Sequence, residues 1–119
     1  MNREHDSKIK GDDFKIPANL SELGNVAVRT ILDCAVQQFG DIGGGGCRAF
    51  YSPKEWAARG ETYGHNSELV VVHDGGDLAP FFNYDYERYE LTEEMHNALK
   101  KRGLYAEPCT CWYTAIYRM

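Results

Sequence analysis

Two cysteines, Cys109 and Cys111, lie one residue apart in the stretch EPCTCWY near the C-terminus. Paired thiols can hold zinc or exchange with a disulfide, so this spacing raises the question of catalysis. On an extended strand, however, alternate side chains leave the same face about 6–7 Å apart. The sulfurs of a tetrahedral zinc site are only about 3.8 Å apart, because each Zn–S bond is ~2.3 Å long. We therefore predict that both cysteines are packing residues of a strand.

The sequence context of the two thiols also argues against redox chemistry. Efficient dithiols are usually C-x-x-C pairs at a helix N-terminus, where the helix dipole stabilises a thiolate. Here the expected helix precedes the cysteines and directs its negative end toward them. We predict neither a redox centre nor a metal site, and no cofactor.

Two further stretches contain ligand-type residues in the wrong context. The glycine run Gly43–Gly46, followed by Arg48, could hold a phosphate. Phosphate loops, however, run from a strand to a helix N-terminus, whereas this run leads from a helix to a strand. VVVHDGGD could supply a His-Asp metal pair, but turn chemistry explains Asp74 and Asp77, and the end of a strand explains His73. We therefore predict no catalytic residue.

One arrangement for catalysis or ligand binding stays open at this point. Cys47, His73 and Cys109 could meet, together with Tyr113, in a pocket beside the glycine run. A histidine close to a cysteine can act as its base, but only where the fold brings the two together. A small-ligand-binding protein or small enzyme that uses this Cys/His pocket is our alternative hypothesis.

The most unusual stretch is acidic and aromatic and lies between Asp74 and Glu94. It holds seven acidic residues against one base, Arg88, for a formal charge of −6. The whole chain carries −5, so the remainder totals +1 (−5 minus −6). The same window contains the aromatic residues Phe81, Phe82, Tyr84, Tyr86 and Tyr89.

One interpretation of this stretch is purely structural: a hairpin strand with a solvated face leads into a helix whose glutamates complement its dipole. The other interpretation is a binding surface, because tyrosine is enriched at interface hot spots and carboxylates attract a basic partner. The residues of this predicted partner-binding surface are Tyr84, Asp85, Tyr86, Glu87, Tyr89, Glu90, Glu93 and Glu94.

A row of carboxylates can also occupy a groove that normally holds nucleic-acid phosphates. The sequence therefore favours a small non-enzymatic binding protein that acts on a basic protein. An inhibitor of a nucleic-acid-handling or host-defence enzyme, of the kind that phages and mobile elements encode, fits this description. Direct binding to nucleic acid or to a membrane surface is not expected, because both are anionic, as is this chain.

Composition is typical of a single soluble globular domain. The chain has 119 residues, of which 43% are hydrophobic and 26% are charged. No apolar run approaches the ~20 residues that cross a bilayer, and the polar N-terminus differs from a signal peptide. We expect a cytoplasmic protein with a mobile tail at residues 1–15 and one domain at residues 16–119.

Periodicity and turn residues predict an α+β domain with a mostly antiparallel sheet of about four strands packed by helices, in the order α-β-α-β-β-α-β. The first helix begins after Asn19 or Ser21 and ends at Gly40. Its apolar arc is broad, so a homodimer is an alternative to a helix buried within one chain. The other predicted elements are a strand at 47–51, a helix capped by Ser52, strands at 67–73 and 78–84 joined by the DGGD turn, a helix at 92–102 capped by Thr92, and a strand at 104–117.

Overall fold

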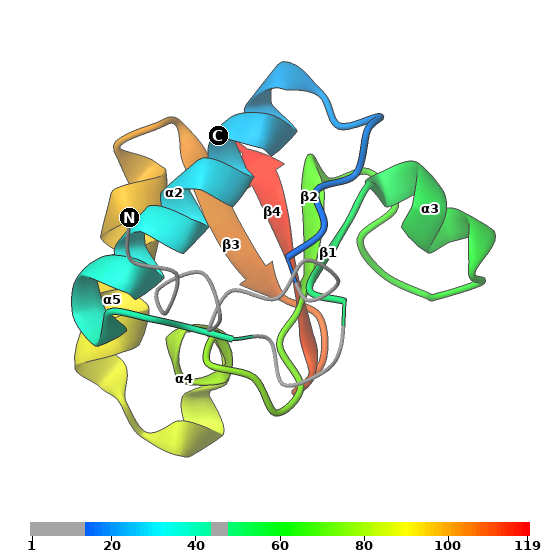
Figure 1. Ribbon diagram of the computed structural model, residues 1–119. Helices are drawn as coiled ribbons and strands as arrows, with labels where there is room; N and C mark the ends of the chain where they lie inside the picture. The colour runs from blue at the N-terminus through cyan, green and yellow to red at the C-terminus, as the bar shows by residue number, and fades with distance from the viewer. Residues whose placement is uncertain (1–13, 44–47) are drawn as a thin grey trace.

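The computed structural model describes residues 14–43 and 48–119, which form an antiparallel four-stranded sheet packed with helices (Figure 1). The strand order is β1-β2-β4-β3, and every neighbouring pair is antiparallel. This confirms the predicted α+β class. The elements are α2 (Glu22–Phe39), β1 (Phe50–Tyr51), α3 (Pro53–Ala58), β2 (Leu69–Val72), α4 (Ala79–Phe82), the 3-10 helix η1 (Tyr84–Tyr86), α5 (Tyr89–Lys100), β3 (Leu104–Pro108) and β4 (Tyr113–Arg118).

Helix α2 begins and ends where the sequence predicts. The hydroxyl of Ser21 accepts the Gly24 N–H at 3.0 Å, and Gly40 ends the helix at a φ of 78° that favours glycine. Gly24 also allows α2 to approach the sheet, because a Cβ there would lie 2.5 Å from the Glu68 carbonyl oxygen. None of the helices in the described residues is long and apolar enough to span a bilayer.

The start of α3 is also as predicted. The Ser52 hydroxyl accepts the Glu55 N–H at 3.1 Å, and the Glu55 carboxylate accepts the Ser52 N–H at 2.9 Å. These reciprocal bonds satisfy two donors that a helix start otherwise leaves unpaired, and Pro53 lacks the N–H that would be a third.

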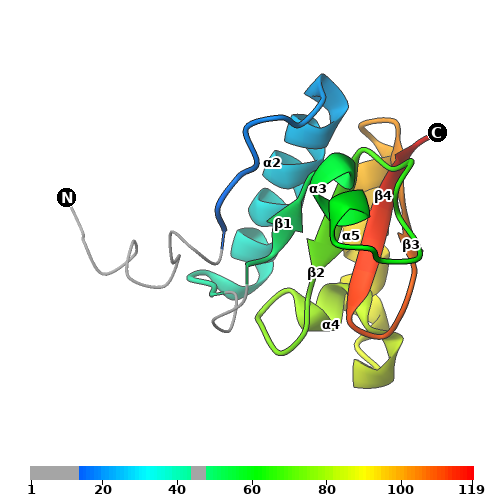
Figure 2. The ribbon, with the colours of Figure 1, turned by 90° about the vertical axis from the view of Figure 1, so that its right-hand side faces the viewer.

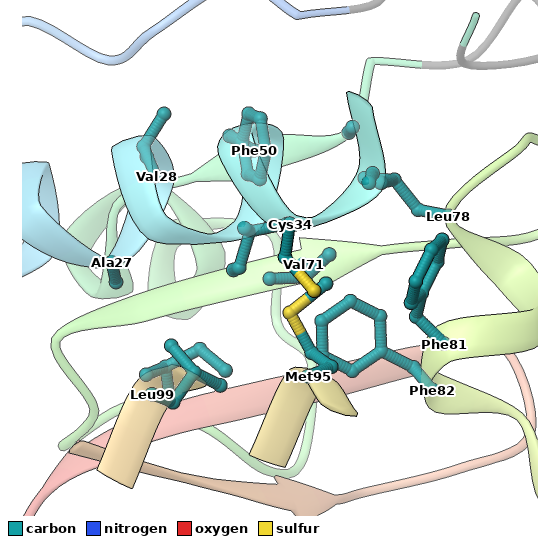
Figure 3. Close-up of a cluster of buried hydrophobic side chains, with 14 of the residues drawn as sticks. Ala27, Val28, Cys34, Phe50, Val71, Leu78, Phe81, Phe82, Met95 and Leu99 are labelled. Atoms are coloured by element: carbon teal, nitrogen blue, oxygen red, sulfur yellow. The ribbon is translucent and has the colours of Figure 1, made fainter. Parts of the chain in front are cut away.

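The larger hydrophobic core lies between the sheet and the helices α2, α4 and α5 (Figures 1 and 2). In Figure 3, Cys34 of α2 and Met95 of α5 extend toward each other within it. Phe14 belongs to this core at 6% exposure and lies 6.0 Å from the Phe50 ring, so part of the segment predicted as a tail is packed. Residues 1–13 of that predicted tail lie outside the described residues. A smaller cluster of Trp56, Val70 and Tyr113 packs against the opposite face of the sheet.

The predicted strand at 78–84 is wrong, because residues 79–82 form the short helix α4. Both edges of β2 are already occupied, by β1 on one side and by β4 on the other. The predicted turn does contain a positive φ, 80° at Gly75. The loop that follows bonds to Gly43 instead of forming a hairpin, since Asp77 donates to the Gly43 carbonyl at 2.8 Å and accepts its N–H at 2.8 Å.

The single strand predicted at 104–117 is in fact a hairpin of β3 and β4. Its loop comprises residues 109–112 and therefore contains both cysteines of EPCTCWY. The Thr110 hydroxyl accepts the N–H groups of Trp112 and Tyr113, each at 3.2 Å, and so stabilises the turn without glycine. Strand β4 is central in the sheet and lies between β2 and β3.

Helix α5 starts earlier than predicted, at Tyr89 instead of Thr92. Thr92 is buried inside the first turn, where its hydroxyl donates to the Tyr89 carbonyl at 3.0 Å. Thr92 is therefore not the cap. The observed element order, α-β-α-β-α-α-β-β when η1 is left out, corrects the predicted order after β2.

Candidate functional site

Residues 84–94, here called the acidic segment, run from η1 into the first turns of α5. All eight residues of the predicted partner-binding surface are exposed: Tyr84, Asp85, Tyr86, Glu87, Tyr89, Glu90, Glu93 and Glu94. The three tyrosines are 44%, 49% and 59% exposed in chain order. The predicted residues are thus available to solvent; Tyr84 lies in η1 instead of the predicted hairpin strand, and Glu93 and Glu94 lie on a helix as predicted.

Local hydrogen bonds fix the path of the acidic segment. The Asn83 side-chain oxygen accepts the Asp85 N–H at 2.9 Å and starts η1. Glu87 ends η1 in the left-handed conformation, with a φ of 57°, and donates its N–H to the Tyr84 carbonyl at 2.9 Å. A glutamate in this conformation is strained by about 1–2 kcal/mol. The chain therefore turns sharply between η1 and α5.

Buried side chains on either side of the acidic segment hold it against the larger core. Phe81 and Phe82 precede it, and Leu91 and Met95 lie on the inner side of α5. Their exposed neighbours on α5 are consequently directed outward, because residues three or four apart share one face of a helix and the opposite face is left to solvent. The segment is a folded surface in contact with the core.

His73 supports Phe82 from the end of β2. Its ring stacks on the Phe82 ring at 5.5 Å and 24°, and its Nε2 lies 2.9 Å from the Thr114 hydroxyl. Only 2% of His73 is exposed, and burial lowers its pKa to about 4, although the nearby Asp74 carboxylate opposes that shift. His73 is therefore neutral near pH 7 and serves as a packing residue.

The acidic segment leaves most of its charge uncompensated. Arg88, its one base, bonds to Glu90 with Nε 2.8 Å from Oε2, and this bond lowers the pKa of the Glu90 carboxyl. Tyr84 makes an edge contact with the His96 ring at 6.3 Å. Within the described part of the chain, the remaining acids form no ion pair: Asp85, Glu87, Glu93 and Glu94. Their carboxylates therefore face solvent as fixed negative charge.

The structure places the cysteine loop beside the acidic segment, which the sequence did not reveal. Residues 82–85 and 108–111 line one groove of about 320 Å³. A usable signal was Pro108, since proline has no N–H to donate and is rare within a central strand. It marks the end of β3 and hence the position of the loop.

The prediction for the two cysteines is therefore only partly right. Cys109 is half-buried against the Trp56 cluster, and burial raises the pKa of its thiol. Cys111, by contrast, is exposed in the loop and not packed in a strand. Among the described residues, no three His, Cys, Asp or Glu side chains are grouped so that they could hold a metal ion.

Of the residues of the alternative Cys/His pocket, Cys109 packs beside Tyr113, but His73 packs on a different side of the sheet. His73 stacks on Phe82 in the larger core, whereas Cys109 packs against the Trp56 cluster on the opposite face of the sheet. Cys47 lies outside the described residues. Arg48, the base next to the glycine run, binds both carboxylate oxygens of Glu55, at 2.8 and 3.0 Å, and so is engaged within the chain.

Two larger grooves adjoin this region, and each includes a residue of the acidic segment or of the cysteine loop. One, of about 700 Å³, separates α2 from α5 and is lined by mixed charges, including Asp33, Glu94 and residues 100–102. The other, of about 400 Å³, lies between residues 62–66 and the β3–β4 hairpin. The second groove is lined by one exposed carboxylate, that of Glu107, and by the exposed ring of Tyr63, whereas the acidic segment gathers several of each.

Comparison with models of protein families, with curated proteins and with solved structures finds no match for this chain. Function is therefore inferred from the residues of this chain and from their geometry.

Proposed function

We propose that this protein is a small, non-enzymatic binding protein whose acidic segment binds a basic protein. The observation that carries the proposal is the joint exposure of all eight predicted residues on one continuous stretch. Three exposed tyrosines supply contact area at low entropic cost, and the carboxylates supply complementary charge.

Competition with nucleic acid is the mechanism that this surface supports best. A protein groove that binds DNA or RNA is lined with lysine and arginine, because phosphate contacts supply much of the affinity. Carboxylates on a folded surface can occupy such a groove, and tyrosine rings can stack where bases otherwise would. The protein then inhibits a nucleic-acid-handling or host-defence enzyme by covering its groove, as phage and mobile-element inhibitors do.

The direct test is affinity capture from a host lysate with immobilised protein, at low and at high salt. Screening weakens contacts between exposed charges, so the partner should be recovered at low salt and depleted at high salt. Replacing Glu87, Glu90, Glu93 and Glu94 with glutamine should abolish recovery. Recovery of the same partner by this variant would refute the proposal.

A matched control separates the position of the charge from its amount. Glu87→Gln with Glu93→Gln changes the net charge by the same two units as Glu22→Gln with Asp33→Asn on the exposed side of α2, and neither Glu87 nor Glu93 lines the groove that contains Asp33. The first pair should weaken capture strongly, and the second should leave it close to wild type. Equal loss in both would show that overall charge, and not the acidic segment, determines binding.

A further inference from the structure

The groove between the acidic segment and the β3–β4 loop has a size suited to one side chain. Its volume is about 320 Å³, and its walls are residues 82–85 and 108–111. Small-molecule pockets have volumes of about 300 Å³ or more, so the volume of this groove is at the lower limit for a small ligand. It is large enough for one long side chain. It is also continuous with the surface that we propose binds the partner.

The walls of the groove combine an apolar interior, an aromatic ring and a carboxylate. Phe82 is 3% exposed and lines the inner part, while Pro108 contributes apolar surface from the loop. Tyr84 is 44% exposed, and Asp85 next to it is exposed and makes no ion pair within the described residues. The exposed Cys111 completes the wall on the loop side.

We propose, building on the proposed function, that this groove receives an arginine side chain of the basic partner. The aliphatic stem of arginine packs on apolar surface while its charged head stays at the polar rim. The planar guanidinium stacks on an aromatic ring such as Tyr84 and binds a carboxylate such as that of Asp85 through paired N–H groups. One groove thus offers each part of the arginine side chain a matching contact.

The same chemistry favours arginine over lysine. The lysine ammonium is compact and strongly hydrated, so it gains less from a ring and makes no planar, paired contact with a carboxylate. Citrulline keeps the shape of arginine but lacks the charge. Oligo-arginine, oligo-lysine and oligo-citrulline peptides of equal length are therefore suitable probes.

Cys111 reports whether the groove is filled. The test measures the rate of Cys111 alkylation, by mass spectrometry of the labelled peptide. Oligo-arginine and oligo-lysine are each added at about ten times their Kd, and oligo-citrulline is added at the concentration used for oligo-arginine. Oligo-arginine should slow the reaction about tenfold, because only the free protein reacts. A positive charge that is merely nearby would favour the thiolate and speed the reaction, so slowing indicates coverage.

Asp85→Asn should weaken oligo-arginine binding about tenfold, equivalent to ~1.4 kcal/mol, and reduce the protection of Cys111 at the same peptide concentration. Asp74→Asn removes one charge from the same acidic window but outside the groove. It should change neither the affinity for oligo-arginine nor the protection of Cys111 by more than about twofold.

The outcomes separate the groove from the wider surface. Slowing by oligo-arginine, little slowing by oligo-lysine and none by oligo-citrulline supports the proposal. In one contrary result, oligo-arginine binds and leaves Cys111 unprotected; in another, Asp85→Asn and Asp74→Asn weaken its binding equally. Either result rejects the groove as the arginine site but leaves the acidic segment as a binding surface. Equal protection by oligo-lysine overturns the preference for arginine. No binding of either cationic peptide overturns both this inference and the proposed function.

Discussion

Two clusters in this protein combine aromatic rings with charges, and they differ in whether those charges find partners within the chain. The first, here called the paired cluster, consists of Arg48, Tyr51, Glu55, Trp56 and Arg59. Arg48 binds the Glu55 carboxylate and lies 4.3 Å from the centre of the Tyr51 ring. Arg59 lies 5.3 Å from the Tyr51 ring centre and 4.8 Å from that of Trp56.

The second cluster is the acidic segment. Its one arginine, Arg88, pairs with Glu90, and its tyrosine rings are exposed to solvent. In the paired cluster, arginines cover the rings and neutralise the carboxylate, so most of its charges and ring faces already have partners within the chain. In the acidic segment, similar residue types keep their charge and ring faces available. Composition alone therefore does not identify a binding surface; the supply of counter-charges within reach distinguishes a structural cluster from one that can bind a partner.

The largest expected contrast concerns an aromatic residue from each cluster. Trp56 is fully buried, so Trp56→Ala should lower the free energy of unfolding by about 3–5 kcal/mol through lost burial and a cavity. Tyr89 is 59% exposed, so Tyr89→Ala should change stability by less than about 0.5 kcal/mol. Urea unfolding measures both. A large loss of stability in Tyr89→Ala would mean that the acidic segment is structural, and it would contradict the distinction between the two clusters.

The next effect is pH-dependent and concerns His73, which supports the acidic segment through Phe82. The unfolded chain protonates a histidine near pH 6.5, whereas His73 in the folded protein has a pKa of about 4. The unfolded state therefore gains a proton first as the pH falls. The contribution of His73 to stability is complete above pH 6.5 and is lost progressively toward pH 4, by on the order of 3 kcal/mol.

The measurement is urea unfolding at several pH values for wild type and His73→Phe. Other groups titrate in the same range, so the informative quantity is the difference between the two proteins. Wild type should lose stability more steeply than His73→Phe between pH 6.5 and pH 4, because phenylalanine takes up no proton. Parallel curves would show that His73 does not titrate as a buried neutral group.

Two ion pairs with the same shortest nitrogen–oxygen distance but different surroundings sharpen the comparison further. The nitrogen–oxygen distance is 2.8 Å in both Arg48–Glu55 and Arg88–Glu90. Glu55 also caps α3, so Glu55→Ala should cost about 1–2 kcal/mol of stability. Glu90→Ala should leave the free energy of unfolding unchanged within error, because its pair is exposed to solvent. Thermal unfolding of both variants tests this, and equal losses would contradict it.

The sequence predicted well wherever the signal was local. The start of α3 depends on residues within four positions of one another, and the end of α2 depends on one glycine. The exposure of the acidic segment was also predictable, because its charged residues could not be buried without partners. High β-propensity likewise identified β2, and the strand predicted at 104–117 contains β4.

The errors arose where distant segments decide the structure. Residues 79–82 are apolar enough for a strand, but β4, more than forty residues beyond β2, takes the position beside it. The loop at 109–112 has no glycine, since the Thr110 hydroxyl supplies the turn bonds instead. The groove between this loop and the acidic segment depends on that hairpin, so local pattern could not reveal it.

The smallest predicted effect on stability comes from Glu87→Gly, which should stabilise the fold and weaken binding. Glu87 adopts a left-handed φ of 57°, which glycine accepts without strain, so Glu87→Gly should stabilise the fold by about 0.5–1 kcal/mol once its greater unfolded-state entropy is subtracted. The same change removes an exposed carboxylate from the acidic segment and should weaken capture of the basic partner. Glu87→Ala, which removes the carboxylate but keeps the strain, should weaken capture without stabilising the fold. If Glu87→Gly is more stable and still captures the partner as well as wild type, the carboxylate has no part in binding and the strain belongs to the turn alone.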